Sequence, residues 1–163
     1  DLFLLTAGID AAVEGGARKE VSLQFRRAID DRVHILVDAA VAEQTDIILA
    51  GYGLKEVLVL LDKIAQEGNS TKAPSRIPGL EEETLKSKIE LFNTNLFSPL
   101  VPAFDNISDS KIRAESRKRT SDAVINGYKR VHAVVASPGS GYVNAGAWLL
   151  YTPEQVKSLL SQS

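Results

Sequence analysis

Apolar side chains recur every three or four residues along most of the chain, which is the spacing of one face of an α-helix. The clearest run covers about residues 17–50, where charged residues such as Arg26, Asp30 and Asp38 fall between the apolar ones. Its apolar positions are Phe25, Ile29, Val33, Leu36, Ala40 and Val41. The pattern predicts one long helix with an apolar stripe and a charged back. At about 1.5 Å per residue such a helix is roughly 50 Å long, a length typical of elongated helical bundles.

Breaks in the periodicity divide the rest of the chain. An apolar segment at 2–13 is followed by a pair of glycines, and a Gly-Tyr-Gly sequence ends the long helix. A shorter helix follows to about residue 67. Residues 68–79 then form a linker with two prolines and small polar side chains. A second helical half covers 80–163, so we expect one all-α domain over 1–163.

The second half contains helices separated by a proline-containing apolar corner and a glycine-rich loop. Asp109 or Ser108 caps a helix that runs to about residue 136, and 137–152 form a loop. Thr152 caps a short last helix with Pro153 in its first turn. The residues expected to pack are Leu85, Ile89, Phe92, Leu96, Phe97, Leu100, Val101, Phe104, Ile112, Val124, Ile125, Tyr128, Val131 and Val135. We expect the end of the bundle to be sealed by Tyr128, Trp148, Tyr151, Leu159 and Leu160.

Composition excludes several kinds of protein. Hydrophobic residues make up 44% and charged residues 25%, which is ordinary for a globular chain, and the net charge of -2 gives no whole-molecule attraction to nucleic acid or anionic lipid. The absence of cysteine excludes a disulfide framework, a Cys-ligated zinc site and thiol chemistry. The longest uncharged stretch, 131–153, is broken by Pro138 and several glycines, so we expect no membrane-spanning helix. Because the chain lacks methionine and begins with Asp1, we interpret it as a fragment or a processed product.

No motif for catalysis, a cofactor or a metal is found in the sequence. The two histidines, His34 and His132, lack the spacing of a metal-ligand pair, and we expect the first to be solvated and the second partly buried. There is no Gly-x-Ser-x-Gly motif and no phosphate-binding loop, and we interpret residues 139–141 as a turn. The acidic groups at 30–31 and 81–83 are interpreted as a solvated face and a helix start rather than catalytic pairs. We therefore expect no enzyme activity.

The densest group of charges is a basic cluster, which we define as Lys111, Arg113, Arg117, Lys118 and Arg119. Such a cluster near a helix start can meet phosphates, anionic lipid or an acidic partner helix. No aromatic side chains interleave with it, as single-stranded nucleic-acid binding would need. The pattern favours a solvated helix face, and a partner- or membrane-facing surface is the alternative.

Several short motifs occur in a characteristic order. Residues 128–132 read Tyr-Lys-Arg-Val-His, Ser-Pro and a tyrosine follow, and residues 152–160 read Thr-Pro-Glu-Gln-Val-Lys-Ser-Leu-Leu. Upstream stand Ile29-Asp30, Leu36-Val37-Asp38, Glu43-Gln44, Gly53-Leu54, Ile77-Pro78, Leu85-Lys86 and Leu100-Val101-Pro102. This set, spanning about 25–160, resembles the C-terminal region of subunit 6 of the conserved oligomeric Golgi complex. The chain departs from that family's pattern at His132, where an aromatic residue is expected, and in its loop at 137–146.

The resemblance implies a helical-rod fold of the kind found in multisubunit tethering complexes, here as the C-terminal domain of a longer chain. It implies a non-catalytic subunit without a cofactor, peripheral on the cytosolic side of the Golgi membrane. The implied role is vesicle tethering in intra-Golgi retrograde transport. The implied partners are the other subunits of the complex, SNARE proteins and Rab GTPases, with no nucleic acid.

Two alternatives stay open at this point. The chain could be a helical domain of another vesicle tether, such as an exocyst subunit, which only the identity of its partners would distinguish. It could also be a lipid- or nucleic-acid-binding module that acts through the basic cluster. Binding of that kind would weaken steeply with salt and would be lost on replacing Arg117, Lys118 and Arg119 with alanine.

Overall fold

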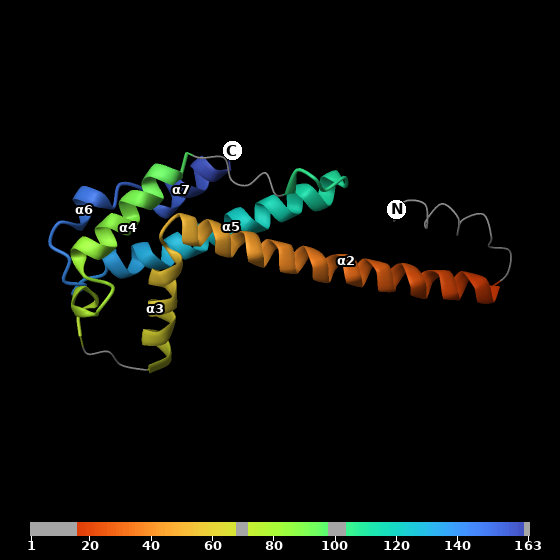
Figure 1. Cartoon of the computed structure of the whole chain (residues 1–163), viewed down its shortest axis with the longest axis horizontal. Coiled ribbons are helices and arrows are strands. Elements are labelled where there is room, and N and C mark those ends of the chain that lie inside the picture. Colours follow the sequence, from red (N-terminus) through yellow and green to blue (C-terminus); the bar gives the residue numbers. More distant parts are fainter. Residues whose placement is uncertain (1–15, 68–71, 98–103, 162–163) are drawn as a thin grey trace. The chain divides into compact units, whose positions relative to one another are not determined.

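The computed structural model describes residues 16–67, 72–97 and 104–161, and these ranges contain helices and no strand, as the all-α prediction requires (Figure 1). The elements in order are α2 (Gly16–Gly51), α3 (Lys55–Glu67), the 3-10 turn η1 (Pro74–Arg76), α4 (Glu82–Asn95), α5 (Ser110–Ala136), α6 (Ala145–Trp148) and α7 (Pro153–Leu160). The predictions for the segment 2–13, the start of the linker, and Leu100 and Val101 lie outside the described residues.

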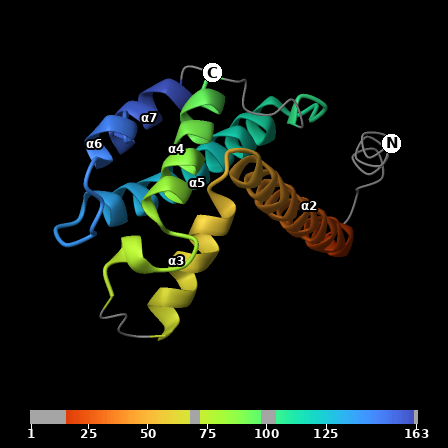
Figure 2. The same cartoon turned by 60° about the vertical axis from the view of Figure 1, so that its left-hand side comes forward.

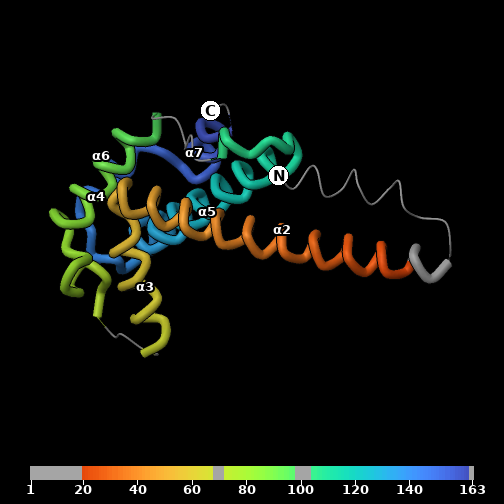
Figure 3. Tube along the Cα trace, turned by 45° about the vertical axis from the view of Figure 1, so that its right-hand side comes forward, coloured from red at the N-terminus to blue at the C-terminus, as the bar shows by residue number. Residues whose placement is uncertain are grey.

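Two compact units make up the chain, residues Asp1–Ala40 and Val41–Ser163. The described part of the first unit is the N-terminal portion of α2. The second unit contains the last turns of α2 and all the other helices. Helix α2 runs without a break over Gly16–Gly51, and Figure 3 traces its coloured part as one continuous coil, which confirms the predicted long helix at about 17–50.

An aromatic stack lies at the centre of the second unit. The ring of Phe92 in α4 stacks on Tyr128 in α5 with 4.6 Å between centroids, and meets Tyr52 edge-on at 5.7 Å. Helix α5 contacts both α3 and α7, while α4 contacts α6 (Figure 2). The largest fully buried side chains are Leu54, Val57, Leu80, Leu85, Ile89, Phe92, Leu96, Val124, Tyr128, Val131 and Val156. The predicted packing faces of α4 and α5 are thereby confirmed for these residues.

A glycine allows helix α5 to approach its neighbours closely. A Cβ atom added at Gly127 would lie 3.0 Å from Leu58 Cδ1 and 3.2 Å from Leu49 Cδ2. Both distances are shorter than ordinary carbon–carbon contacts. The side chains of Leu49 and Leu58 therefore use the space that a larger residue on α5 would fill.

The apolar stripe predicted for α2 does not run along one buried face. Val41 is buried, whereas Phe25 and Leu36 are 45% and 63% exposed. With 3.6 residues per turn, Leu36 lies about 140° from Val41 around the helix axis, but Ile48, which is buried in the second unit, lies only about 20° from Val41. The face of α2 that joins the core is thus a different face from the one that carries the stripe.

Some local features differ from the predictions. The linker contains η1, and the predicted loop at 137–152 contains α6. Phe97 was expected to pack with Leu96 and Phe104, but it is 64% exposed, whereas its two neighbours are buried. Phe97 follows the last turn of α4, so its side chain points away from the face that buries Leu96.

Candidate docking surfaces

The basic cluster lies on the first turns of α5, and Asp109 begins this helix. The Oδ1 atom of Asp109 accepts hydrogen bonds from the backbone N–H groups of Lys111 at 2.8 Å and Ile112 at 3.0 Å, which confirms the predicted cap. The bonds from Ile112 and then Lys111 hold the pKa of Asp109 below its ordinary value. Asp109 therefore stays ionised at the helix N-terminus, where a negative charge is favourable.

Two arginines of the cluster fasten the segment that precedes α5. Arg113 donates from Nη1 to the backbone carbonyl oxygen of Ile107 at 2.6 Å, and Arg117 forms an ion pair with Asp105. These contacts bridge from the helix to residues that come before its cap. Part of the cluster's charge therefore has a structural role.

The other cations of the cluster differ in exposure. Lys118 pairs with Asp122 one turn further along α5 at 3.0 Å, an interaction that raises the pKa of Lys118, yet the lysine side chain is 71% exposed. Lys111 is exposed and Arg119 is half-buried. The exposed cations of the cluster are thus Lys111, Arg117 and Lys118, and the last two are each paired with an acidic side chain.

A shallow hollow of about 370 Å³ lies along α7 and is the second candidate surface. Its lining residues, which recur at helical spacing, are Tyr151, Glu154, Gln155, Ser158 and Leu159. The Tyr151 ring meets the exposed Phe97 edge-on, with 6.3 Å between centroids. An open hollow with an aromatic wall suits contact with another protein better than enclosure of a small ligand.

Tyr128 holds the backbone of Tyr151, one of the residues that line this hollow. Its hydroxyl donates to the backbone carbonyl oxygen of Tyr151 at 2.5 Å, and burial raises the pKa of Tyr128 to about 12. The residues expected to seal the end of the bundle are all buried or half-buried: Tyr128, Trp148, Tyr151, Leu159 and Leu160. The sequence predicted this seal, but not the exposed Phe97 beside it.

The glycine-rich loop is clasped to the η1 turn and the residues before α4. Ser75 donates its backbone N–H to the carbonyl oxygen of Ser140 at 3.1 Å, and the Tyr142 hydroxyl donates to the carbonyl oxygen of Leu80 at 2.8 Å. Gly141 has a φ of +81°, and a Cβ atom added there would lie 2.2 Å from Ser75 Oγ. Only glycine fits this position without a shift of the loop or of η1, so the predicted turn at 139–141 is also a packing contact.

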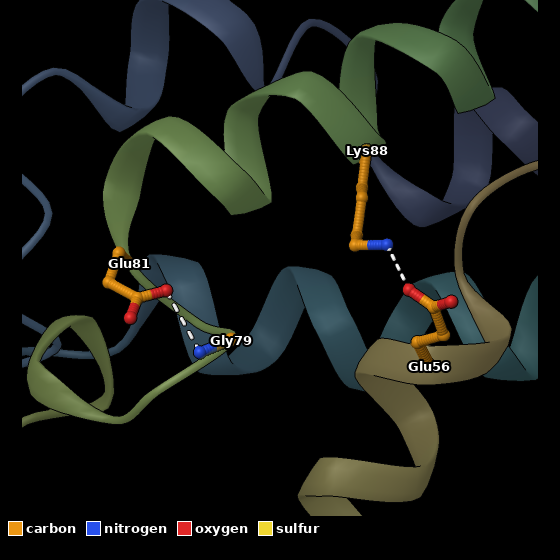
Figure 4. Close-up of polar contacts among 4 residues, drawn as sticks. All are labelled: Glu56, Gly79, Glu81 and Lys88. Atoms are coloured by element: carbon orange, nitrogen blue, oxygen red, sulfur yellow. Dashed lines mark hydrogen bonds and ion pairs between the residues drawn. The ribbon is translucent and has the colours of Figure 1, made fainter.

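The acidic residues at the start of α4 accept hydrogen bonds from other parts of the fold, in addition to being favoured by the helix dipole. Glu82 accepts hydrogen bonds from the backbone N–H groups of Val143 at 3.3 Å and Asn144 at 3.1 Å. Glu81 accepts from the Gly79 N–H at 2.9 Å (Figure 4). Burial, then the nearby carboxylates of Glu81 and Glu82, raises the pKa of Tyr142 to about 12.

An ion pair joins α4 to α3. Lys88 on α4 pairs with Glu56 at the start of α3, as Figure 4 shows, and the lysine's hydrogen bond lowers the pKa of Glu56. These two charged side chains thus neutralise each other across two helices. Neither the acidic start of α4 nor this pair forms a catalytic arrangement of buried carboxylates.

The histidines and carboxylates of the described residues were compared with the arrangement that a metal site needs. Over residues 16–67, 72–97 and 104–161, no three His, Cys, Asp or Glu side chains are grouped so that they could hold a metal ion. His34 is exposed and His132 is half-buried beside the Tyr128 ring, as expected. Among the helices that the structure describes, none has both the length and the apolar character needed to cross a membrane.

Comparisons with known proteins give a consistent family. The family model described as Conserved Oligomeric Golgi complex subunit 6, C-terminal, matches residues 17–160. The chain is similar to conserved oligomeric Golgi complex subunit 6 of Rattus norvegicus, with 27% identity over 128 residues, covering 77% of this chain and 19% of the relative. It is 26% identical over 128 residues to the Homo sapiens protein, covering 77% and 19%, and 25% identical over 129 residues to that of Dictyostelium discoideum, covering 76% and 18%. The chain therefore spans about a fifth of the length of these relatives. No solved structure matches it.

Proposed function

Because the chain belongs to the family of C-terminal regions of conserved oligomeric Golgi complex subunit 6, we propose that it is a non-catalytic docking region of a vesicle-tethering subunit. The observation that carries the proposal is the family match over residues 17–160, which takes in nearly all of the described helices. In this proposal the region works in intra-Golgi retrograde transport, peripherally on the cytosolic side of the Golgi membrane. Its partners are the other subunits of the complex, with SNARE proteins and Rab GTPases as further candidates.

The surfaces support a role in binding proteins. Helices present extended lateral faces, and the hollow along α7 combines aromatic and apolar walls with polar side chains such as Glu154. Buried aromatic anchors with a polar rim are the usual anatomy of a protein interface. We place one partner contact at this hollow and at the exposed Phe97.

The basic cluster is part of the same proposal, as a partner- or membrane-facing surface. Its support is the exposure of Lys111 and Lys118. Reversing the charge of Arg117 would also break its tie to Asp105, so Lys111→Glu is the cleaner variant. Lys129→Glu, on an exposed position of α5 outside the cluster, is the matched control. Loss of complex binding or Golgi attachment with the first variant alone is expected, and unchanged binding and attachment with both would reject the surface.

The experiment that tests the proposal is cross-linking in cells of the chain's own species. The tagged chain is expressed, cross-linked and purified under denaturing conditions, and the attached proteins are quantified by mass spectrometry. We expect enrichment of other conserved oligomeric Golgi complex subunits, reduced when Tyr151 is replaced by glutamate in the α7 hollow but unchanged for Ser87→Glu on the exposed side of α4. Enrichment of exocyst subunits instead, or of no tether subunit, would overturn the proposal.

A further inference from the structure

The side chains that line the α7 hollow follow two neighbouring rows along the helix. One row is Tyr151, Gln155 and Leu159, and the other is Glu154 and Ser158, each with steps of four residues. Rows with this spacing form ridges on a helix surface, and the groove between two such ridges accepts the side-chain ridge of a second helix. The hollow therefore has the form of a helix-docking groove about two turns long.

The α7 hollow lies on a helix that the fold already holds in place. On its other side α7 buries Val156 and Leu160, and it contacts α5. Tyr151, at one end of the hollow, is held by the Tyr128 hydroxyl, and its ring meets Phe97 edge-on. Because Phe97 is 64% exposed, an aromatic ring beside the hollow faces solvent. A partner thus needs to order little of this surface when it binds, which favours affinity.

The charge of the α7 hollow selects among partner helices. Glu154 is the one charged side chain among the described residues that line the hollow, and it is exposed. A lysine or arginine placed opposite Glu154 would be attracted, whereas an acidic residue there would be repelled. Apolar side chains of the partner are needed opposite the aromatic rings of Tyr151 and Phe97 and the side chain of Leu159.

We propose that the α7 hollow binds an amphipathic helix of another protein, whose apolar ridge packs between the two rows and whose lysine or arginine faces Glu154. The two helices then cross at about −50°, the angle produced when both pack through ridges with steps of four residues. The inference rests on the proposed docking role and adds to it the chemistry of the partner. A second copy of this chain and an extended peptide are the competing occupants, and the experiment distinguishes them.

Photo-cross-linking from the edge of the α7 hollow identifies the occupant. The whole chain, with a photo-reactive phenylalanine analogue in place of Phe97, is expressed in cells of its own species and irradiated, and the linked peptide is sequenced by mass spectrometry. We expect a peptide of another protein with apolar residues at steps of three or four and a lysine or arginine near the linked position. A link to a second copy of this chain, to an acidic segment, to one with strand-like alternation, or to no protein would overturn the inference.

Two matched pairs of variants test shape and charge separately. Ser158→Trp fills the hollow and should abolish the link, whereas Lys157→Trp, on an exposed position of α7 outside the lining, should leave it unchanged. Glu154→Lys should lower the yield of the link by about fivefold, and Glu43→Lys on an exposed position of α2 should not. Circular dichroism checks that all four variants keep their helices, and a pair whose members behave alike would overturn the inference. Absence of every tether subunit from the purified proteins would reject the proposed function, whereas enriched subunits with no link at the hollow would reject this inference alone.

Discussion

Residues 20–40 and residues 41–161 contain similar apolar side chains, but those of the first region are largely exposed and those of the second region are largely buried. In the first region Phe25, Ile35 and Leu36 are 45–66% exposed, although they lie on a regular helix. In the second region, which starts on the same helix, Ile48 and Leu49 are buried with side chains from five other helices. A continuous helix can therefore take part in a core at one end and present an apolar surface along the other.

The difference in exposure between the two regions shows that sharing a helix face and being buried are separate properties, although one periodic sequence pattern suggests both. Periodicity determines which residues share a helix face, but a face is buried only where another element covers it. In the second region the core side chains are covered by helices from distant parts of the sequence, such as α4 with Phe92 and α5 with Tyr128. In the first region Phe25, Ile35 and Leu36 stay exposed although they lie on a regular helix.

The largest contrast between the regions is expected on removing an aromatic ring. Phe92→Ala removes a fully buried ring that contacts both Tyr52 and Tyr128, and should lower the free energy of unfolding by about 3–5 kcal/mol. Leu23→Ala removes an exposed side chain and should change it by less than about 0.5 kcal/mol. Denaturant unfolding followed by circular dichroism measures both. Similar losses for the two variants would remove the distinction between the regions.

The next contrast lies within the second region, at two glycines of one loop. Gly141 and Gly139 both have positive φ angles, +81° and +84°, but only Gly141 is packed against Ser75. Gly139→Ala should cost about 1 kcal/mol from backbone strain alone, and Gly141→Ala about 3 kcal/mol because its Cβ also collides with η1. Thermal unfolding under identical conditions gives the difference. Equal costs would show that the clasp contributes no packing energy.

We expect the stability of the chain to fall at high pH because of a buried tyrosine in the second region. The pKa of Tyr128 is raised to about 12, so above pH 10 the unfolded chain loses this proton while the folded chain keeps it. The stabilisation is complete below pH 10 and declines as the pH rises towards 12, by on the order of 2 kcal/mol. Urea unfolding at several pH values measures the decline. Tyr128→Phe should remove only part of the decline, because the pKa of Tyr142 is also raised to about 12 and gives a similar loss. An unchanged slope in that variant would assign the decline to other groups.

The smallest effect concerns how α7 is held at the edge of the second region. Thr152 and Gln155 form a capping box, in which the threonine oxygen accepts from the Gln155 N–H at 3.3 Å and the glutamine oxygen accepts from the Thr152 N–H at 2.8 Å. Thr152→Ala should cost about 1 kcal/mol. Ser158→Ala on an exposed position of the same helix is the control, expected within about 0.5 kcal/mol of the parent. Equal stabilities of both variants would contradict a contribution from the cap.

Local signals in the sequence predicted much of this fold. Thr152 with Pro153, and Asp109, marked helix starts because capping depends on residues within one turn. The face of Leu85, Ile89 and Phe92 followed from their spacing. Resemblance to the family, carried by ordered short motifs, gave the same assignment as the family model.

Long-range contacts could not be predicted in the same way. The exposure of Phe97 depends on where α4 stops and on Tyr151, which is far away in sequence. The pairing of Arg117 with Asp105 turned part of an apparent basic surface into a tie within the fold. Sequence spacing identifies which residues are charged or apolar, but the partners that neutralise or cover them are chosen by the tertiary structure.

Hydrogen exchange at several protein concentrations tests the central contrast most directly. Helices α3, α4, α5 and α7 should be protected to the same degree at every concentration, because their cover comes from within the chain. Amides of residues 22–40 should be weakly protected at every concentration, because the large apolar side chains there are exposed. Protection of 22–40 that equals that of α5 would contradict the account.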